Sequence, residues 1–228
     1  AINIDGGTRD ISFYNAAGNS QALFWDASAE SLGIGTTSPD ALLDISSATT
    51  STLRLSNSDI ALTEGQITGQ LEFYQGDTSS QGTGITGKIA MRSVPLTGGG
   101  YFGNAADMDF YVSGDSNGYA SNNATLKALT IQAGSGNVGI GTDSPETNLH
   151  VKGGSDMGIR IESANDGYAS LQFGDADDTV RGGITYNNAD DSLQLRGYNN
   201  TERMRISSSG NVGIGSSDPQ STLQVASL

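Results

Sequence analysis

LGIGTTSPDALLDI (residues 32–45), VGIGTDSPETNLHV (138–151) and VGIGSSDPQSTLQV (212–225) are three copies of one fourteen-residue motif. Such a repeat indicates that each copy belongs to one supersecondary module, which buries its apolar surface by packing against another module. The fold of the chain therefore depends on what this motif can form.

Each copy is typical of two short strands joined by a tight corner. In the last copy, Val212 and Ile214 share one face of an extended strand, and the intervening glycines leave the other face open to a second backbone. Pro219 disfavours helix before it, so the chain turns there, and alternation resumes at Leu223 and Val225. The recurring structural positions are Gly33, Gly35, Pro39, Gly139, Gly141, Pro145, Gly213, Gly215 and Pro219.

The segments between the copies can be aligned as the same series of short strands. Apolar residues alternate with polar ones in each run, and clusters of Gly, Asn, Asp and Ser bound the runs, which predicts an all-β fold. The runs lie at 53–55, 71–73, 87–91, 108–112 and 129–131 in the longer segment, and at 159–161, 171–173, 182–186, 193–195 and 204–206 in the shorter one.

The spacing of the copies predicts three modules of unequal length. Pro39 and Pro145 lie 106 residues apart, whereas Pro145 and Pro219 lie 74 apart, and Gly- and Ser-rich insertions account for the difference. We expect the C-terminal part of a first module at 1–47, a longer second module with loop insertions at 48–152, and a shorter third module at 153–228.

Bulky apolar residues are scarce. Leu, Ile, Val and Phe together number 46 of 228 residues, about 20 %, so each module is thin and gains stability by packing on another copy. We expect an elongated array of meander modules, intertwined or side by side in a homotrimer. A row of self-sufficient small β-sandwiches is the alternative.

The charge excludes some partners. A net charge of −14, with no basic block, argues against nucleic acid, which binds cationic surfaces. Cysteine is absent, so no disulfide or thiolate metal site is available, and assembly in a reducing cytoplasm would suit the chain. No apolar stretch predicts membrane insertion, and no motif calls for a cofactor.

Few residues suit catalysis or metal binding. His150 occupies a strand position where the other copies have Asp44 and Gln224, which favours a polar surface role over a catalytic base. The carboxylates of Asp107 and Asp109 would have to face each other across a cleft to hydrolyse a glycoside. The aspartates 175, 177, 178, 190 and 191 lack the spacing of known Ca²⁺ loops, which favours solvated turns. We therefore predict no enzymatic activity.

A glycan-binding surface is predicted in the insertion of the longer module. Exposed aromatic rings and amide side chains on loops suit sugar rings, and surface loops with buried aromatic anchors are the competing interpretation. The candidate residues are Tyr101, Phe102, Asn104, Tyr119 and Asn122.

Two longer stretches carry a family resemblance. ERMRISSSGNVGIG (202–215), followed by Pro219 and the Leu-x-Val pattern, resembles the repeat of bacteriophage tail-fibre and adhesin-like proteins, especially those of marine and cyanobacterial hosts. FGDADDTVRGGITY (173–186), followed by DDSL (190–193), resembles the module body of the same proteins. The first copy departs from the pattern, with ESL at 30–32 in place of Gly-Asn-Val.

The resemblance implies an elongated, trimeric protein attached to the virion. Many members end in a self-cleaving chaperone of the endosialidase type, which nothing in this sequence matches. We expect a structural shaft segment of a tail fibre or similar appendage, assembled in the host cytoplasm, with other virion tail proteins and host surface polysaccharide as partners. A carbohydrate-binding adhesin acting through the loops of the longer module is the alternative.

Overall fold

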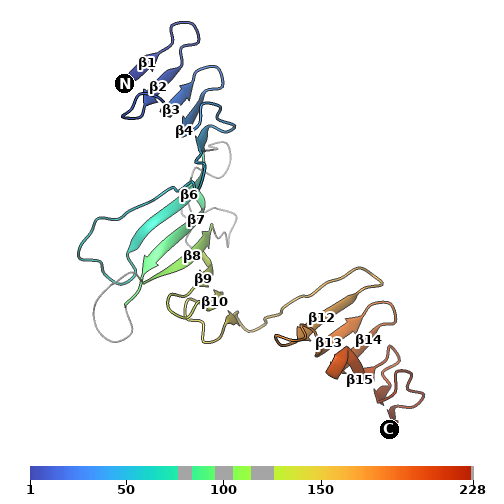
Figure 1. Cartoon of the computed structure of the whole chain (residues 1–228). Helices are drawn as coiled ribbons and strands as arrows, with labels where there is room; N and C mark the ends of the chain where they lie inside the picture. The colour runs from blue at the N-terminus through green and yellow to red at the C-terminus, as the bar shows by residue number, and fades with distance from the viewer. Residues whose placement is uncertain (77–83, 96–104, 114–125, 227–228) are drawn as a thin grey trace. The chain divides into compact units, whose positions relative to one another are not determined.

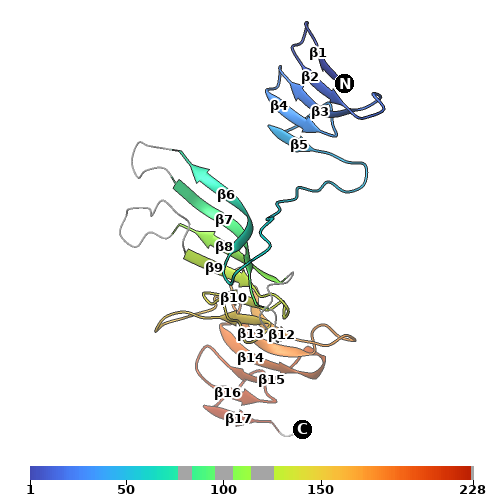
Figure 2. The same ribbon diagram turned by 90° about the vertical axis from the view of Figure 1, so that its left-hand side faces the viewer.

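The computed structural model describes residues 1–76, 84–95, 105–113 and 126–226, and the chain divides into two compact units, Ala1–Gly153 and Gly154–Leu228. Within the described residues the strands form three sheets, and one 3-10 turn, η1, spans Tyr198–Asn200. The prediction of an all-β fold is confirmed. In every sheet the strands pair in chain order (Figures 1 and 2).

The first sheet lies within residues 1–47. Its strands are β1 (Ile2–Ile4), β2 (Ile11–Tyr14), β3 (Gln21–Asp26), β4 (Ser31–Ile34) and β5 (Leu43–Ile45). The first three pairings are antiparallel, whereas β4 and β5, the two strands of the motif, run parallel.

The second sheet lies within residues 48–152 and has the same order of pairings. Its strands are β6 (Ile67–Gln75), β7 (Gly84–Ser93), β8 (Ala106–Val112), β9 (Leu126–Ile131), β10 (Val138–Ile140) and β11 (Leu149–Val151). Only the pairing of β10 with β11, again within the motif, is parallel.

The third sheet lies within residues 153–228. Its strands are β12 (Tyr168–Phe173), β13 (Gly182–Asn187), β14 (Ser192–Gly197), β15 (Thr201–Ile206), β16 (Val212–Ile214) and β17 (Leu223–Val225). Here β16 and β17 form the parallel pair. Because residues opposite each other on paired strands point to the same face, the register assigns the paired side chains of each sheet to one of two faces, apart from the irregular positions at the β-bulges.

One face of each sheet, which we call the apolar face, carries the large apolar side chains. In the first sheet it comprises Ile2, Ile4, Ile11, Phe13, Leu23, Trp25, Leu32, Ile34, Leu43 and Ile45. In the second it comprises Leu71, Phe73, Ile89, Met91, Met108, Phe110, Val112, Leu126, Leu129, Ile131, Val138, Ile140, Leu149 and Val151. In the third it comprises Ala169, Leu171, Phe173, Ile184, Tyr186, Leu193, Leu195, Met204, Ile206, Val212, Ile214, Leu223 and Val225.

The opposite face, which we call the polar face, holds most of the buried side chains. Asp109, Thr130 and Ser192 on it are completely inaccessible, and Gln194 is 2 % exposed. On the apolar faces, by contrast, Phe173 is 55 % exposed. Among the described residues, and leaving aside prolines and glycines, Phe24 and Ala90 are the only buried apolar residues. In the described residues, therefore, mostly polar side chains are buried and large apolar side chains are exposed, which is the reverse of a globular core.

Two of the predicted strands are wrong. Residues 53–55 and 159–161 alternate like strands, yet the structure gives neither of them a strand partner within the described chain. Leu53 and Ile159 are 62 % and 68 % exposed. Alternation alone does not make a strand, because the backbone donors and acceptors also need a second strand to pair with.

Candidate functional site

The motif corner is the first recurring site, and it explains the glycines. Between β16 and β17 the chain crosses the polar face of the sheet, so that the Ser216 carbonyl lies against Gly213, where a Cβ atom would collide with it. Gly215 then turns with a φ of 71°, in the left-handed region that favours glycine. Gly33 and Gly139 meet the carbonyls of Thr36 and Thr142 in the same way.

These corners close a parallel strand pair over an unusually short span. Parallel neighbours ordinarily need a crossover of about a dozen residues, whereas residues 215–222 suffice between β16 and β17. The backbone hydrogen bonds from Val212 N to Thr222 O and from Ala226 N to Ile214 O, 3.0 and 2.9 Å, fix the pair at both ends. The sequence predicted the strands and the corner but not the parallel direction.

An asparagine before the first strand of the motif holds the proline. Asn211 Nδ2 donates to Pro219 O over 3.0 Å, and Asn137 Nδ2 donates to Pro145 O over 3.2 Å. Pro145 and Pro219 are both buried. In the first copy Ser31 takes the place of the asparagine, and its buried Oγ has no hydrogen-bond partner among the described residues.

The polar residue in the second strand of the motif accepts a hydrogen bond from the backbone of the corner. Gln224 Oε1 accepts from Gln220 N, Asp44 Oδ2 accepts from Asp40 N, and His150 Nδ1 accepts from the backbone four residues earlier in the same way. The three side chains are interchangeable because each offers an acceptor to the corner. His150 is thus a half-buried turn acceptor.

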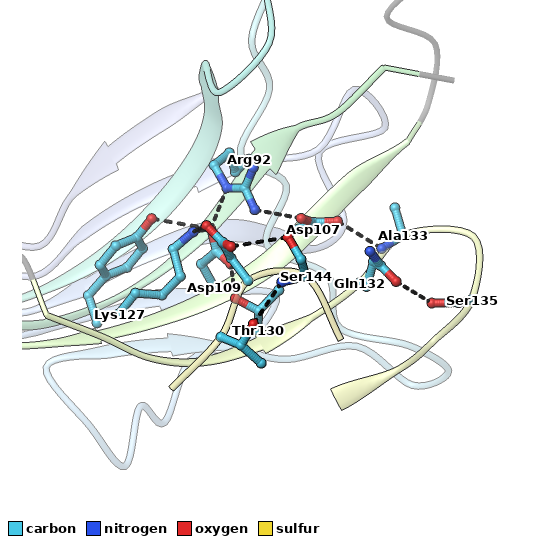
Figure 3. A network of polar contacts seen from close by, with 12 residues as sticks. Arg92, Asp107, Asp109, Lys127, Thr130, Gln132, Ala133, Ser135 and Ser144 are labelled. Carbon is cyan, nitrogen blue, oxygen red and sulfur yellow. Dashed lines mark hydrogen bonds and ion pairs between the residues drawn. The ribbon is translucent and has the colours of Figure 1, made fainter. Parts of the chain in front are cut away.

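A charged network lies on the polar face of the second sheet, where Arg92 on β7 reaches two carboxylates of β8 (Figure 3). Arg92 Nε lies 2.7 Å from Asp109 Oδ2, and Arg92 Nη2 lies 2.5 Å from Asp107 Oδ2. Lys127 Nζ on β9 lies 3.2 Å from Asp109, and Thr130 Oγ1 donates to its other oxygen over 2.7 Å. Every oxygen of the buried Asp109 is therefore occupied.

The network holds Asp109 in its ionised form. Burial by itself would raise the pKa of Asp109, but hydrogen bonds from Arg92, Thr130 and Lys127 outweigh it and lower the pKa below its ordinary value. A general acid for glycoside hydrolysis needs a raised pKa. The two carboxylates also share one arginine rather than facing each other across a cleft. The arrangement therefore suits a structural ion-pair network.

The aspartates of the third module serve its turns. Asp175 Oδ1 accepts the backbone N–H groups of Asp177 and Asp178, while Asp175 Oδ2 pairs with Arg181 Nε over 2.6 Å. The N–H of Asp178 is the main cause of the lowered pKa of Asp175, and Arg181 adds to it. Asp190 accepts from Ser192 Oγ and Arg205 Nη1. In the part of the chain that the structure describes, no group of three or more metal-ligating side chains comes together.

The predicted glycan-binding residues are not placed by the structure. Tyr101, Phe102, Asn104, Tyr119 and Asn122 all lie outside the described residues, so the loop hypothesis stays a prediction. Among the described elements there is no helix with the length and apolar character needed to cross a membrane.

The site that sequence reasoning missed is the polar face itself. The sequence does not predict the buried ion pairs of Arg92 on this face of the second sheet. It does predict that the motif glycines leave one strand face open to a second backbone, and the corner carbonyls do lie against Gly33, Gly139 and Gly213. The corner glycines were the available signal, because a bare strand face indicates close approach of another backbone. Compared with known proteins, the chain matches no family model, and no curated protein is significantly similar to it.

Proposed function

We propose that this chain is a shaft segment of a phage tail fibre or a similar virion appendage, in which several copies, three in our proposal, pack through their apolar faces. The observation that carries the proposal is the uncovered apolar face on each of the three sheets, together with the near absence of buried apolar residues in the described part of the chain. Its role is structural, and it supports host attachment without catalysing a reaction.

The apolar faces support a second copy of the same chain as the occupant. They carry no charged residue, and the same kind of face recurs in all three sheets. Soluble proteins rarely leave a contiguous apolar patch of this kind uncovered. Because each copy presents an equivalent face, a closed symmetric arrangement buries all of them, and three sheets around an axis leave only polar faces to solvent.

The unpaired segments support the same conclusion. Residues 53–55 and 159–161 keep the alternating pattern of strands but have no strand partner among the residues that the structure describes. An extended segment with free N–H and C=O groups and exposed leucine or isoleucine side chains is a ready template for pairing with another chain. In the assembly that we propose, a neighbouring copy supplies that partner.

The resemblance to tail-fibre repeats supports a location of the proposed assembly on the virion. GNVGIG at 210–215 and the following proline resemble that repeat. The structure gives a physical reason for each of these positions: close approach at Gly213, a left-handed turn at Gly215 and a hydrogen bond from Asn211 to Pro219. We infer virion localisation, assembly in the host cytoplasm, and other virion tail proteins as partners.

Labelling of virus particles tests the function. Antibodies raised against residues 154–228 should bind to tail appendages of intact particles of the phage that encodes this chain, as seen by immunogold electron microscopy. Antibodies adsorbed with the purified chain serve as the control and should not label. Label confined to the capsid, or label found only in lysate and never on particles, would contradict the proposal.

A further inference from the structure

A hollow on the polar face of the third sheet combines several features of a ligand-binding site. Its volume is about 280 Å³, just below the range of drug-sized ligand pockets, which runs from roughly 300 to 1,000 Å³. It is open on one side and of a size that suits a single sugar ring. The residues that line it are Tyr168, Ser170, Gln172, Gly182, Gly183, Thr185, Arg196 and Asn200.

A glycine in a cross-strand row lines the hollow with backbone alone. Gln172 on β12, Gly183 on β13 and Arg196 on β14 lie opposite one another on the polar face, and the middle position has no side chain. The corresponding row of the second sheet is filled, since Lys88 occupies the middle position and its Nζ lies 4.6 Å from the centre of the Tyr111 ring. The two modules therefore differ in the residue at the middle of this row.

Arg196 provides a positive charge that no carboxylate neutralises among the described residues. Its Nε and Nη2 donate to Gln194 Oε1 and its Nη1 donates to Asn200 O, at distances between 2.9 and 3.2 Å. Glu202, opposite Arg196 on β15, is bound to Arg205 over 2.8 Å. A guanidinium has five N–H donors, so two remain for a ligand.

Tyr168 supplies an aromatic surface next to that charge. The guanidinium carbon of Arg196 lies 5.7 Å from the centre of its ring, and the side chain is 58 % exposed. An aromatic ring packs against the apolar face of a sugar, while the amide of Gln172 and the hydroxyl of Ser170 offer hydrogen bonds to its hydroxyl groups. A fixed guanidinium fork is the preferred partner of a carboxylate.

We propose that this hollow binds a carboxylate-bearing sugar residue of a polysaccharide, with Arg196 pairing with the carboxylate and Tyr168 contacting the ring. At about 0.15 M salt the Debye length is about 8 Å, so the net negative charge of the chain weighs little against direct contact with Arg196. The polar face stays accessible when the apolar face is covered. The site lies wholly within the third sheet and does not depend on the assembly proposed above.

A glycan array with the full chain tests this proposal. The array should pair glycans containing uronic or sialic acids with the same glycans after reduction of the carboxyl groups, and binding should be at least tenfold stronger to the acidic member of each pair. Arg196→Gln should abolish that preference, while Arg196→Lys should keep part of it because the charge remains. Arg160→Gln is the matched control, since Arg160 is 81 % exposed and paired only with Glu162.

Three further measurements test whether the variants stay folded, whether the Tyr168 ring contributes to binding, and whether a simple anion can replace the sugar. Circular dichroism should show that the Arg196 variants retain the fold of the parent chain. Tyr168→Ala should weaken binding to all sugars that bind, whereas Tyr168→Phe should preserve it. Inorganic sulfate should compete poorly. Binding to no acidic glycan, binding unchanged in Arg196→Gln, or competition by sulfate as strong as by the acidic glycans would each overturn the proposal.

Discussion

Asn137 and Asn211 show how one side chain can secure a corner. Each donates from its amide to the carbonyl of the buried proline in its motif. The first copy has Ser31 instead, whose hydroxyl is buried without a partner, and Glu30 beside it adopts a φ of 54° where the other copies have glycine. The corner of the first copy therefore has the least favourable hydrogen bonding and backbone conformation of the three.

Exchange of this residue between the copies should change stability in opposite directions. Asn211→Ala should lower the free energy of unfolding by about 1–3 kcal/mol, because the Pro219 carbonyl loses its donor. Ser31→Asn should raise it by about 1 kcal/mol, because the missing donor to the Pro39 carbonyl is restored. Urea unfolding followed by circular dichroism measures both. Equal effects of the two substitutions would contradict a stabilising role for the hydrogen bond from the asparagine amide to the proline carbonyl.

The glycines under the corners should be intolerant of even one methyl group. Gly213→Ala places a Cβ atom against the Ser216 carbonyl, so we expect a loss of about 1–3 kcal/mol. Gly158→Ala, at a position with ordinary φ and nothing within 4 Å, should change stability by less than about 0.5 kcal/mol. Thermal unfolding of the two variants side by side distinguishes close approach from a general cost of losing glycine.

At the scale of the elements, the second sheet depends on a charge cluster where a globular protein would have an apolar core. Asp109 connects β7, β8 and β9 through Arg92, Lys127 and Thr130. Removal of one partner from a buried ion pair typically costs about 3–5 kcal/mol. Asp109→Asn should therefore destabilise the second sheet at neutral pH by about that amount, measured by urea unfolding.

The same carboxylate predicts a pH dependence. Because the pKa of Asp109 is lower in the folded chain than the value of about 3.9 in an unfolded one, its contribution is fully present above about pH 4 and is lost as the pH falls through the folded value. Unfolding free energy measured from pH 7 to pH 2 should fall below about pH 4. The fall should be shallower in Asp109→Asn, though not absent, because Asp175 contributes in the same direction. An identical slope in both proteins would contradict this account.

The strands themselves were largely predictable from the sequence, because alternation and turn residues are local signals. The runs around Leu71, Ile184 and Leu193 all became strands, and each motif became strand, corner and strand. The local pattern does not predict which strands pair with each other or in which direction. The parallel direction within the motif depends on where the corner crosses the sheet. Residues 53–55 and 159–161 have no strand partner in the described part of the chain, and their alternating pattern does not show this.

The candidate sites were less predictable than the fold. The sequence shows Asp107 and Asp109 as a pair of carboxylates, but their burial around Arg92 depends on the register of β7 with β8. The hollow beside Arg196 is lined by residues of β12, β13 and β14, which the register brings together. Such sites arise from residues that are remote in sequence and adjacent only across a sheet, so a one-dimensional pattern does not show them.

At the scale of the whole molecule, the apolar faces make a specific prediction about assembly. Leu171 and Gln172 are neighbours on β12 and point to opposite faces. Leu171→Glu places a charge on the apolar face and should shift the protein to a slower-sedimenting, smaller species. Gln172→Glu places the same charge on the polar face and should leave the assembly intact. Sedimentation velocity reports both, and equal behaviour of the two variants would show that the apolar face is not the interface.

The mass of the unmodified chain in solution tests the central claim most directly. If copies cover each other's apolar faces, sedimentation equilibrium should give about 70 kDa, three times the 23.4 kDa of one chain, across a range of protein concentrations. A mass of 23.4 kDa at every concentration, from a protein whose circular dichroism shows folded strands, would contradict it.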